Sequence, residues 1–484
     1  MSRFATRHAI IIGGGASGVL LAYQLLQNRE LGFRVTLIER RNEVGRGPAY
    51  HTSNPEHVLN VRAANMSALP DDPEHFWRWL SDRAEGPLCP DPYCFVPRRT
   101  YGDYLASLIG SLTSSERGPR RLAIVHGQCV DLNEGPSGVT VTLADGSQYV
   151  GEVAVLATGN ESPVAKLPCD ADPWSPPSST IEKDATVLIL GTGLTMIDYV
   201  LSLLRNGHRG QIVAMSRRGL LAKAHHRTDP MRIEEKEVPF GADASRLLRW
   251  LRGRIDAHMA AGGDWRSVID AIRPYTQRLW QELPLSSKRR FLEHARAWWD
   301  VHRHRMAPEV EMRLAQALAG GRLSLVAAKV TGIEPNAAGA LVRYRRRGQR
   351  ESANLQVGMI VDCTGIVKDP RATGNPVIQR LFEQGLARAD ALHIGIDIAA
   401  DCAMISRSGI SSRRLFAVGP LTRAAFWEIV AIPDIRNQCA QLTAKLVRID
   451  QQDRLGRIAY ALVGGVPSNV SSRAAGPQNL SAAA

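Results

Sequence analysis

The chain has 484 residues, enough for two or three domains, and carries a formal net charge of +13 with far more arginine than lysine. This charge suits anionic cofactors or substrates, although arginine spread over the surface is the more common explanation. No nucleic-acid-binding module pattern accompanies it, so we expect no nucleic-acid partner. No apolar stretch reaches the roughly 18 residues of a membrane span and no signal peptide is found, so we expect a cytoplasmic protein.

Residues 7–39 show the pattern of a strand, a glycine-rich turn, a helix and a second strand. Gly13, Gly15 and Gly18 have the spacing of a dinucleotide-binding turn. The first permits the tight turn, the second lets the backbone approach a pyrophosphate, and the third lets the helix pack closely on the strand. Glu39 ends the second strand, where an acid accepts hydrogen bonds from ribose hydroxyls. The unit predicts a nucleotide with its phosphates at the helix N-terminus.

A loop-rich segment over residues 41–99 follows, and then a helix near Tyr101–Leu112. The segment contains Cys89 and Cys94, whose spacing is also used by flavin-dependent disulfide reductases, which carry the pair on a helix. Two prolines between these cysteines exclude a helix, and cytosolic thiols are usually reduced. We therefore expect unpaired thiols here rather than a redox disulfide.

A second nucleotide unit begins near Ala185, after a strand that ends at Gly159 and a proline-rich connector over residues 163–177. Its turn contains Gly191 and Gly193, but Met196 replaces the third glycine. The helix of this unit is therefore expected to pack more loosely on its strand, or at a different angle.

Two arginines follow the second strand of this unit. Ser216 ends the predicted strand 211–216, and Arg217 and Arg218 stand where an acid would read a ribose. A carboxylate would repel a 2′-phosphate, whereas guanidinium groups bind it bidentately. The pair therefore predicts NADP rather than NAD.

Residues 225–319 have a helical pattern that is rich in arginine and tryptophan. Trp280, Trp298 and Trp299 recur among apolar residues, which fits a lid or substrate-binding insert and equally a plain helical subdomain with tryptophans in its core. The histidines of His302–His304 are two positions apart and point to different faces of a helix. We expect no metal site.

Strand patterns return after this helical region, and a helix and a polar tail complete the chain. The expected strands cover 323–330, 340–344, 359–363 before Gly365, and 415–418 before Gly419; the helix includes 435–447, and the tail after Gly464 is expected to be disordered.

With these elements in place, the chain resembles the two-dinucleotide-domain flavoproteins, and more narrowly the FAD/NAD(P)-binding family that includes many bacterial oxidoreductases. The resemblance implies an α/β fold with two Rossmann-like domains. It also implies a discontinuous FAD domain over 1–175 and 335–465, an NADP domain over 176–334 with the helical insert at 225–319, and a tail over 466–484. The motifs that carry the resemblance lie at 45–50, 60–63, 191–198, 216–219, 418–422 and 427–429.

The resemblance also implies which residues bind the two cofactors. Asn60 and Met66 would lie near the flavin, although each fits a turn-stabilising or core-filling role equally well. The residues expected to bind or adjoin FAD are Gly13, Gly15, Gly18, Glu39, Gly45, Asn60, Met66, Gly159, Gly365 and Gly419, and those expected at NADPH are Gly191, Gly193, Ser216, Arg217 and Arg218.

The layout is similar to that of single-component flavin monooxygenases, including the N-hydroxylating ones, in which NADPH reduces FAD and molecular oxygen then reacts. The Phe-x-Gly-x-x-x-His fingerprint of Baeyer–Villiger enzymes is missing, which leaves hydroxylation, N-oxidation or plain reduction open. We expect an NADPH-dependent FAD monooxygenase of a small organic substrate. An NAD(P)H:acceptor reductase is the alternative, followed by a non-enzymatic flavin-binding sensor.

No catalytic residue stands out in the sequence. His51, His226 and Glu428 lie in segments expected to face the flavin, as do His225 and Trp427. Each of them is more often structural than catalytic, although an imidazole titrates near neutrality and could transfer a proton. The oligomeric state is left open.

Overall fold

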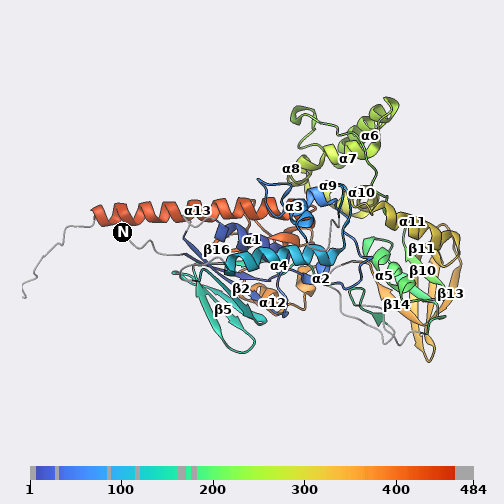
Figure 1. Ribbon diagram of the computed structural model, residues 1–484, viewed down its shortest axis with the longest axis horizontal. Coiled ribbons are helices and arrows are strands. Elements are labelled where there is room, and N and C mark those ends of the chain that lie inside the picture. Colours follow the sequence, from blue (N-terminus) through green and yellow to red (C-terminus); the bar gives the residue numbers. More distant parts are fainter. Residues whose placement is uncertain are drawn as a thin grey trace, which may run out of the picture.

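The computed structural model describes residues 7–27, 32–83, 89–114, 120–161, 170–175, 182–365, 367 and 369–463. Two largely parallel β-sheets with helices packed on them form the two main bodies of the molecule, and a helical insert projects from them (Figure 1). The predicted α/β class with two dinucleotide-type units is therefore confirmed. The predicted tail beyond Gly464 and most of the connector at 163–177 lie outside the described residues.

The first sheet has the strand order β15-β16-β7-β1-β2-β3. Strands β1, β2, β3, β7 and β16 pair in parallel, and β15 adds an antiparallel edge. The central strands β1 and β7 are almost entirely buried, as expected of a parallel sheet covered on both faces. The bounds are β1 Arg7–Ile12, β2 Phe33–Glu39, β3 Leu122–His126, β7 Val153–Leu156, β15 Ala403–Ile405 and β16 Ser411–Ala417.

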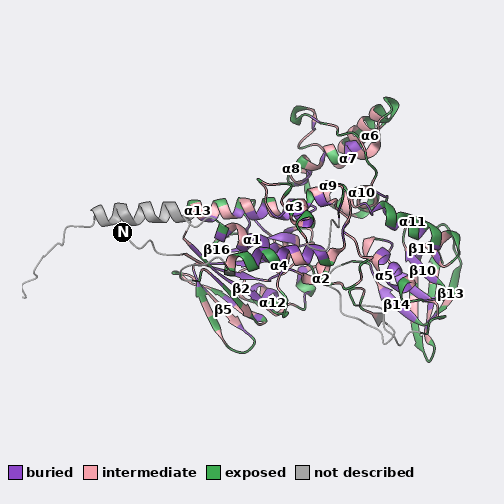
Figure 2. Cartoon of the chain, viewed as in Figure 1, coloured by how far each residue is buried: buried purple, intermediate pink, exposed green. Residues whose placement is uncertain are grey.

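Helix α1 (Ala16–Gln27) packs between two longer helices, α4 (Arg98–Ser114) and α13 (Ile432–Val463). Figure 2 shows buried residues concentrated along α1 and the strands beneath it. Both longer helices extend beyond the lengths predicted from the sequence. The remaining elements of this half are α2 Gly47–Tyr50, α3 His75–Ser81, α12 Pro376–Gln384 and the small antiparallel sheet of β4 Cys129–Glu134, β5 Val139–Leu143 and β6 Gln148–Gly151.

The second sheet has the order β13-β12-β11-β10-β9-β14-β8. Its nucleotide unit consists of β9 (Val187–Leu190), α5 (Leu194–Arg205) and β10 (Ile212–Ser216), and β10 pairs in parallel with β9 and β11. The other strands are β8 Asp170–Ala171, β11 Leu323–Asn336, β12 Gly339–Arg346, β13 Ser352–Val357 and β14 Met359–Asp362.

This pairing moves one expected domain boundary. Residues after 335 were assigned to the first domain, but β12 and β13 hydrogen-bond to β11 and to each other, and β14 pairs with β9. The second body therefore continues to about Gly365. A strand's sheet is decided by its long-range partner, which the local residue pattern does not contain.

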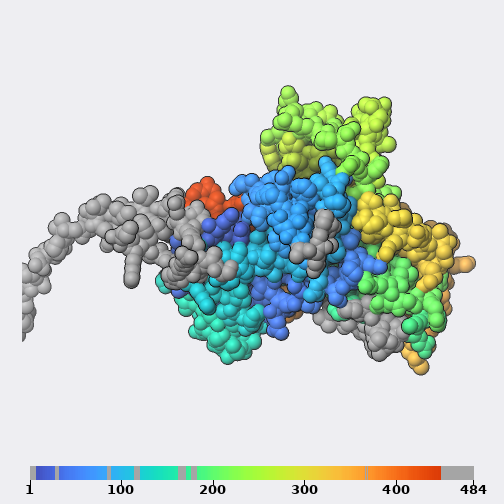
Figure 3. Space-filling model, in the orientation of Figure 1, coloured from blue at the N-terminus to red at the C-terminus, as the bar shows by residue number. Residues whose placement is uncertain are grey.

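The helical insert follows β10 and forms a separate lobe in the space-filling view (Figure 3). Helix α11 (Pro308–Ala319), which was expected to belong to it, instead packs Val310 and Leu314 into the core of the second body. No helix of the described part of the chain is long and apolar enough to cross a membrane. The insert helices are α6 Ala244–Ala260, α7 Trp265–Ala271, α8 Thr276–Glu282, α9 Leu285–Arg290 and α10 Arg296–Arg303, with a π-helical turn at Phe291–Ala295.

Cys89 and Cys94 form a disulfide, so the expectation of unpaired thiols at these two positions is wrong. The prolines between them exclude a helix, but the intervening residues form a turn in which the Cys94 N–H donates to the carbonyl of Asp91 at 2.9 Å. This turn brings the two Cα atoms to 5.8 Å, a normal separation for a disulfide. Four other cysteines in the described part of the chain are free and buried.

Candidate cofactor site

The glycine-rich turn between β1 and α1 depends on contacts that only glycine permits. Gly13 has a φ of +111°, and a Cβ on it would lie 2.5 Å from the carbonyl oxygen of Ala157. A Cβ on Gly18 would overlap the carbonyl oxygen of Gly13. Gly15 differs, because the nearest atom to its Cβ position is the Cα of Gly47 at 3.8 Å. Gly13 and Gly18 therefore build the turn, while Gly15 leaves room for an anion at the helix N-terminus.

Glu39, at the end of β2, stabilises this turn through hydrogen bonds to its backbone. Its Oε2 accepts the N–H of Gly14 at 2.7 Å and its Oε1 accepts the N–H of Arg41 at 2.9 Å. The residue is buried. A carboxylate offers about four acceptor positions, so these two bonds leave capacity for ribose hydroxyls. Glu39 can therefore order the turn and bind a ribose at the same time.

The replacement Glu39→Gln is expected to weaken FAD binding about tenfold. The amide NH₂ of glutamine cannot accept a hydrogen bond from a ribose hydroxyl, and one such hydrogen bond is worth about 1–1.5 kcal/mol. Titration of the apoprotein with FAD measures this effect. Glu43→Gln is the matched control, since Glu43 is more exposed and pairs instead with Arg46 and His51. Equal FAD affinities for the two variants would contradict the role of Glu39.

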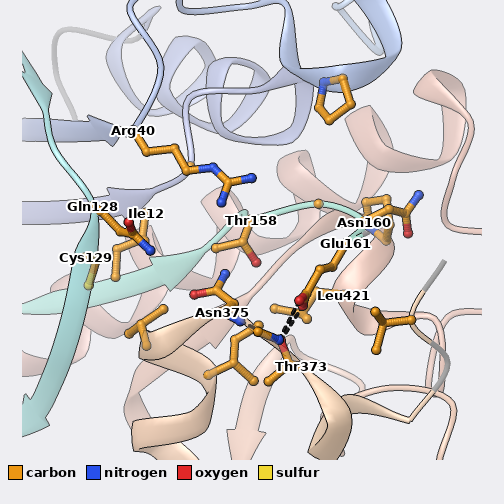
Figure 4. A pocket seen from close by; sticks show the side chains of 18 of the residues that line it. Ile12, Arg40, Gln128, Cys129, Thr158, Asn160, Glu161, Thr373, Asn375 and Leu421 are labelled. Carbon is orange, nitrogen blue, oxygen red and sulfur yellow. Dashed lines mark hydrogen bonds between the residues drawn. The ribbon is translucent and has the colours of Figure 1, made fainter. Parts of the chain in front are cut away.

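A cavity of about 450 Å³ opens beside the turn. Figure 4 shows Arg40, Thr158 and Asn375 arranged around it, from three segments that are distant in the sequence. Its polar lining offers hydrogen-bond donors and acceptors at the carboxyl ends of β1, β2 and β7, the edge where parallel α/β sheets bind ligands. Lining residues that no motif indicated include Arg40, Gln128, Asn160, Thr373, Asn375 and Arg423.

Glu161 fixes one wall of this cavity. Its carboxylate accepts a hydrogen bond from the hydroxyl of Thr373 and one from the N–H of Gly374 at 2.5 Å (Figure 4). The backbone of Glu161 adds a bond, because its carbonyl accepts the N–H of Val367 at 2.9 Å. Glu161 and Thr373 are 212 positions apart, and a single glutamate in a loop carries no sequence signal for such a role.

Two further loops with left-handed glycines pack against the turn. Gly45 (φ +93°) donates its N–H to the carbonyl of Gly14 at 2.7 Å. Gly419 (φ +75°) lies so close to Ser17 that a Cβ would overlap the Ser17 hydroxyl, and its N–H donates to Oε1 of Gln438 at 2.7 Å. Both loops therefore reach the N-terminal end of α1, where phosphates would lie.

The other residues expected at FAD lie in different surroundings. Gly159 lines the cavity with a φ of +71°, and the Cβ position of Gly365 (φ +118°) has no atom within 4 Å. Met66, by contrast, is buried in the hydrophobic core. Asn60 accepts a hydrogen bond from Nε2 of His225 through its backbone carbonyl, at 3.0 Å. Neither Met66 nor Asn60 is among the described residues that line the cavity.

The second turn repeats part of this geometry. Gly191 has a φ of +102°, and a Cβ on it would overlap the carbonyl oxygen of Cys363. The Cβ position of Gly193 has no atom within 4 Å, so it leaves open space as Gly15 does. Met196, in place of the third glycine, is completely buried in the core of the second body.

The loop after β10 is tied to this second turn through hydroxyl groups. Thr192 lies 3.0 Å from the Ser216 hydroxyl, which accepts the N–H of Gly219 at 2.9 Å. The two arginines that follow Ser216 differ in environment. Arg218 donates to the carbonyl of His294 in the insert at 3.0 Å, whereas Arg217 is exposed. Arg217 is therefore the guanidinium more available to an anion beside the turn.

The weak catalytic candidates are held by different partners. His51 is exposed, with its Nδ1 3.4 Å from Glu43, and His226 is exposed, with its Nδ1 3.7 Å from Asp264. His225 is half-buried, and this partial desolvation, together with Arg305, lowers its pKa to about 3. It therefore stays neutral near pH 7 and cannot serve there as a proton donor in imidazolium form.

Glu428 joins the insert to the first body. Its φ of +65° is left-handed, and its buried carboxylate accepts hydrogen bonds from Nε1 of Trp299 and, at 3.0 Å, from Nε of Arg303. Truncating a buried, paired carboxylate leaves its cation unpaired, which is costly. These contacts assign Glu428 a positioning role between α10 and the segment after Gly419.

The comparisons with known proteins agree with this architecture. Residues 10–161 match a family model described as FAD-NAD(P)-binding. No curated protein matches the sequence significantly.

Solved structures match almost the whole chain at low identity. One is the ornithine N-hydroxylase KtzI of Kutzneria sp. 744 with reduced FAD, NADP⁺ and L-ornithine (15% identity, 92% of this chain, 99% of that chain, TM-score 0.61). Another is the cadaverine monooxygenase DfoA of Erwinia amylovora bound to FAD (14% identity, 90% of this chain, 94% of that chain, TM-score 0.62). A third is the thioredoxin reductase of Lactococcus lactis (12% identity, 91% of this chain, 99% of that chain, TM-score 0.50). At these identities the chain shares their two-dinucleotide-domain fold.

Proposed function

We propose that the chain is an NADPH-dependent FAD monooxygenase that hydroxylates or N-oxidises a small organic substrate. The observation that carries the proposal is the pair of nucleotide turns at the carboxyl ends of two parallel sheets. KtzI and DfoA, an N-hydroxylase and a monooxygenase, share this arrangement across 90% or more of the present chain. Since both of those proteins are named for amine substrates, we favour N-oxidation of an amine over C-hydroxylation.

The two cofactors are assigned to the two turns. FAD would lie with its pyrophosphate over Gly15 and its ribose at Glu39, between the loops of Gly45 and Gly419, and NADPH would lie at Gly193 with its 2′-phosphate at Arg217. Bound FAD supplies the electron transfer from the nicotinamide to oxygen. The chain itself would bind the two cofactors, orient them and shield them from water. Glu161 and Arg423 stabilise the walls of the first cavity, and Glu428 holds the insert beside it.

The alternative is an NAD(P)H:acceptor reductase without oxygen insertion. A disulfide-reducing version would need a dithiol that reaches the flavin and a substrate. Cys89 is 2% exposed, and neither Cys89 nor Cys94 is among the described residues that line the cavity. This disulfide is therefore better explained as a structural link, and the surviving alternative is reduction of a quinone or a similar acceptor.

The proposal predicts that purified protein is yellow and releases FAD rather than FMN on denaturation. Mixing the NADPH-reduced protein with oxygen in a stopped-flow spectrometer should show an absorbing species that precedes the return of oxidised flavin. If the reduced flavin is reoxidised directly, without such a species, and the protein reduces quinones quickly, the reductase alternative would be favoured. A colourless protein with no affinity for FAD would contradict both enzyme assignments.

A further inference from the structure

The helical insert contains a second space, an apolar groove of about 740 Å³ that is separate from the cavity beside the first turn. Its walls come from α6, α7, α8, the π-helical turn and α10, and the segment after Gly419 adds Trp427. The lining is dominated by aromatic and aliphatic side chains, which is typical of small-molecule sites of this size. The tryptophans that line it are Trp250, Trp265, Trp280, Trp298, Trp299 and Trp427.

Helix α6 is the least covered wall of this groove. It is 17 residues long and contains no buried residue, although its sequence is amphipathic. Figure 2 shows it in the colours of intermediate and exposed residues. Leu248 on α6 is 40% exposed, Met259 52% and Trp298 on α10 48%, and all three line the groove. An apolar helix face is normally buried, and a contiguous exposed apolar surface indicates a binding site.

The charged side chains in the lining have one sign. Arg252 and Arg290 line the groove, His294 and His302 add imidazoles, and none of the described lining residues is acidic. Tryptophan faces attract cations, but two guanidinium groups beside the same space repel them. Guanidinium groups bind carboxylates and sulfonates well. The groove therefore combines an apolar body site with a basic edge.

We propose that this groove binds an apolar organic anion, such as a medium-chain carboxylate, with its hydrocarbon body against the tryptophans and its anionic group at Arg252 and Arg290. The site does not depend on the cofactor assignments. It is placed to influence the first cavity, however, because Leu421 and Arg423 line that cavity and Trp427, four residues after Arg423, lines the groove. Glu428 and Trp280 fix this segment to the insert, Trp280 through a 2.8 Å bond from Nε1 to the carbonyl of Ala424.

Binding of decanoate to the full-length protein tests the proposal, with tryptophan fluorescence and titration calorimetry as the readouts. Decanoate should quench tryptophan emission and bind at least about tenfold more tightly than butyrate, which lacks about six buried methylenes. It should also bind more tightly than decyltrimethylammonium, which has the same chain and the opposite charge. Equal or tighter binding of the cation, or no binding of decanoate, would overturn the proposal.

Two matched pairs of variants locate the site. Arg290→Glu should weaken decanoate binding about tenfold, whereas Arg289→Glu, one position earlier and outside the lining, should change it less than about twofold. Leu248→Asp should weaken binding, whereas Leu285→Asp should not, because Leu285 is equally exposed (41%) but does not line the groove. Equal effects within either pair would place the ligand elsewhere.

Other occupants of the groove would give different results. Sedimentation-velocity experiments should show that Trp298→Asp leaves the oligomeric state unchanged. A dimer that this variant dissociates, and that decanoate does not affect, would mean that a second copy of the chain covers the groove. Binding to phosphatidylglycerol vesicles without binding of free decanoate would mean a membrane-surface contact. Either result would overturn the proposal.

Discussion

The variant Gly15→Ala is expected to fold normally and bind FAD more weakly, whereas Gly18→Ala is expected to lose stability. A Cβ on Gly15 meets its nearest atom at 3.8 Å, so the apoprotein should be within about 0.5 kcal/mol of wild type. The added methyl would lie where the backbone must approach a pyrophosphate, which should weaken FAD binding by about 2–3 kcal/mol, or about 30- to 150-fold. A Cβ on Gly18 overlaps the Gly13 carbonyl and should cost about 3 kcal/mol of folding free energy.

Two measurements separate these effects. Urea unfolding of the FAD-free proteins reports stability without the contribution of bound ligand, and reconstitution with FAD reports affinity. The second turn supplies a matched comparison, because a Cβ on Gly191 overlaps the Cys363 carbonyl and one on Gly193 meets nothing within 4 Å. Gly193→Ala should therefore raise the KM for NADPH without changing stability. Normal FAD affinity in Gly15→Ala would remove the first turn from the proposed site.

The variant Arg217→Ala is expected to raise the KM for NADPH about 30-fold and the KM for NADH less than about twofold, because a guanidinium–phosphate contact is worth about 2 kcal/mol. Arg217 is exposed after β10, whereas Arg218 donates to His294 of the insert. Arg218→Ala should therefore have a smaller effect on the discrimination between the two cofactors.

Steady-state rates with each cofactor, at several concentrations, measure this discrimination. Arg209→Ala is the control, since Arg209 precedes the same strand at its amino end and pairs with Asp184. It should leave both KM values unchanged. If Arg217→Ala raised the KM for NADH as much as that for NADPH, Arg217 would not read the 2′-phosphate.

The residues near each turn could be recognised from the sequence because each βαβ unit is local. Gly13, Gly18 and Glu39 lie within about thirty positions, and their spacing alone determines which atoms meet. The structure agrees, since Gly18 contacts the Gly13 carbonyl and Glu39 binds the N–H of Gly14.

Other features could not be recognised in this way. The Cys89–Cys94 disulfide was not expected, because excluding a helix does not exclude a turn that brings two cysteines together. Strands β12 to β14 were placed in the wrong domain, because their alternating pattern does not specify their partner. The placement of Asn60 and Met66 near the flavin stays a prediction, and the tertiary structure adds that the Asn60 carbonyl accepts a hydrogen bond from His225 and that Met66 is buried in the core.

By itself, the sequence determined the two nucleotide turns, the acid at the first and the arginines at the second, since these depend on short-range geometry. Only the tertiary structure decided what surrounds them. Glu161 meets Thr373 across 212 positions, and Glu428 meets Arg303 across 125. The apolar groove exists because helices of the insert leave α6 uncovered, with Trp427 contributed from a distant segment. Such contacts depend on how separate elements pack, and packing is determined by the whole chain at once.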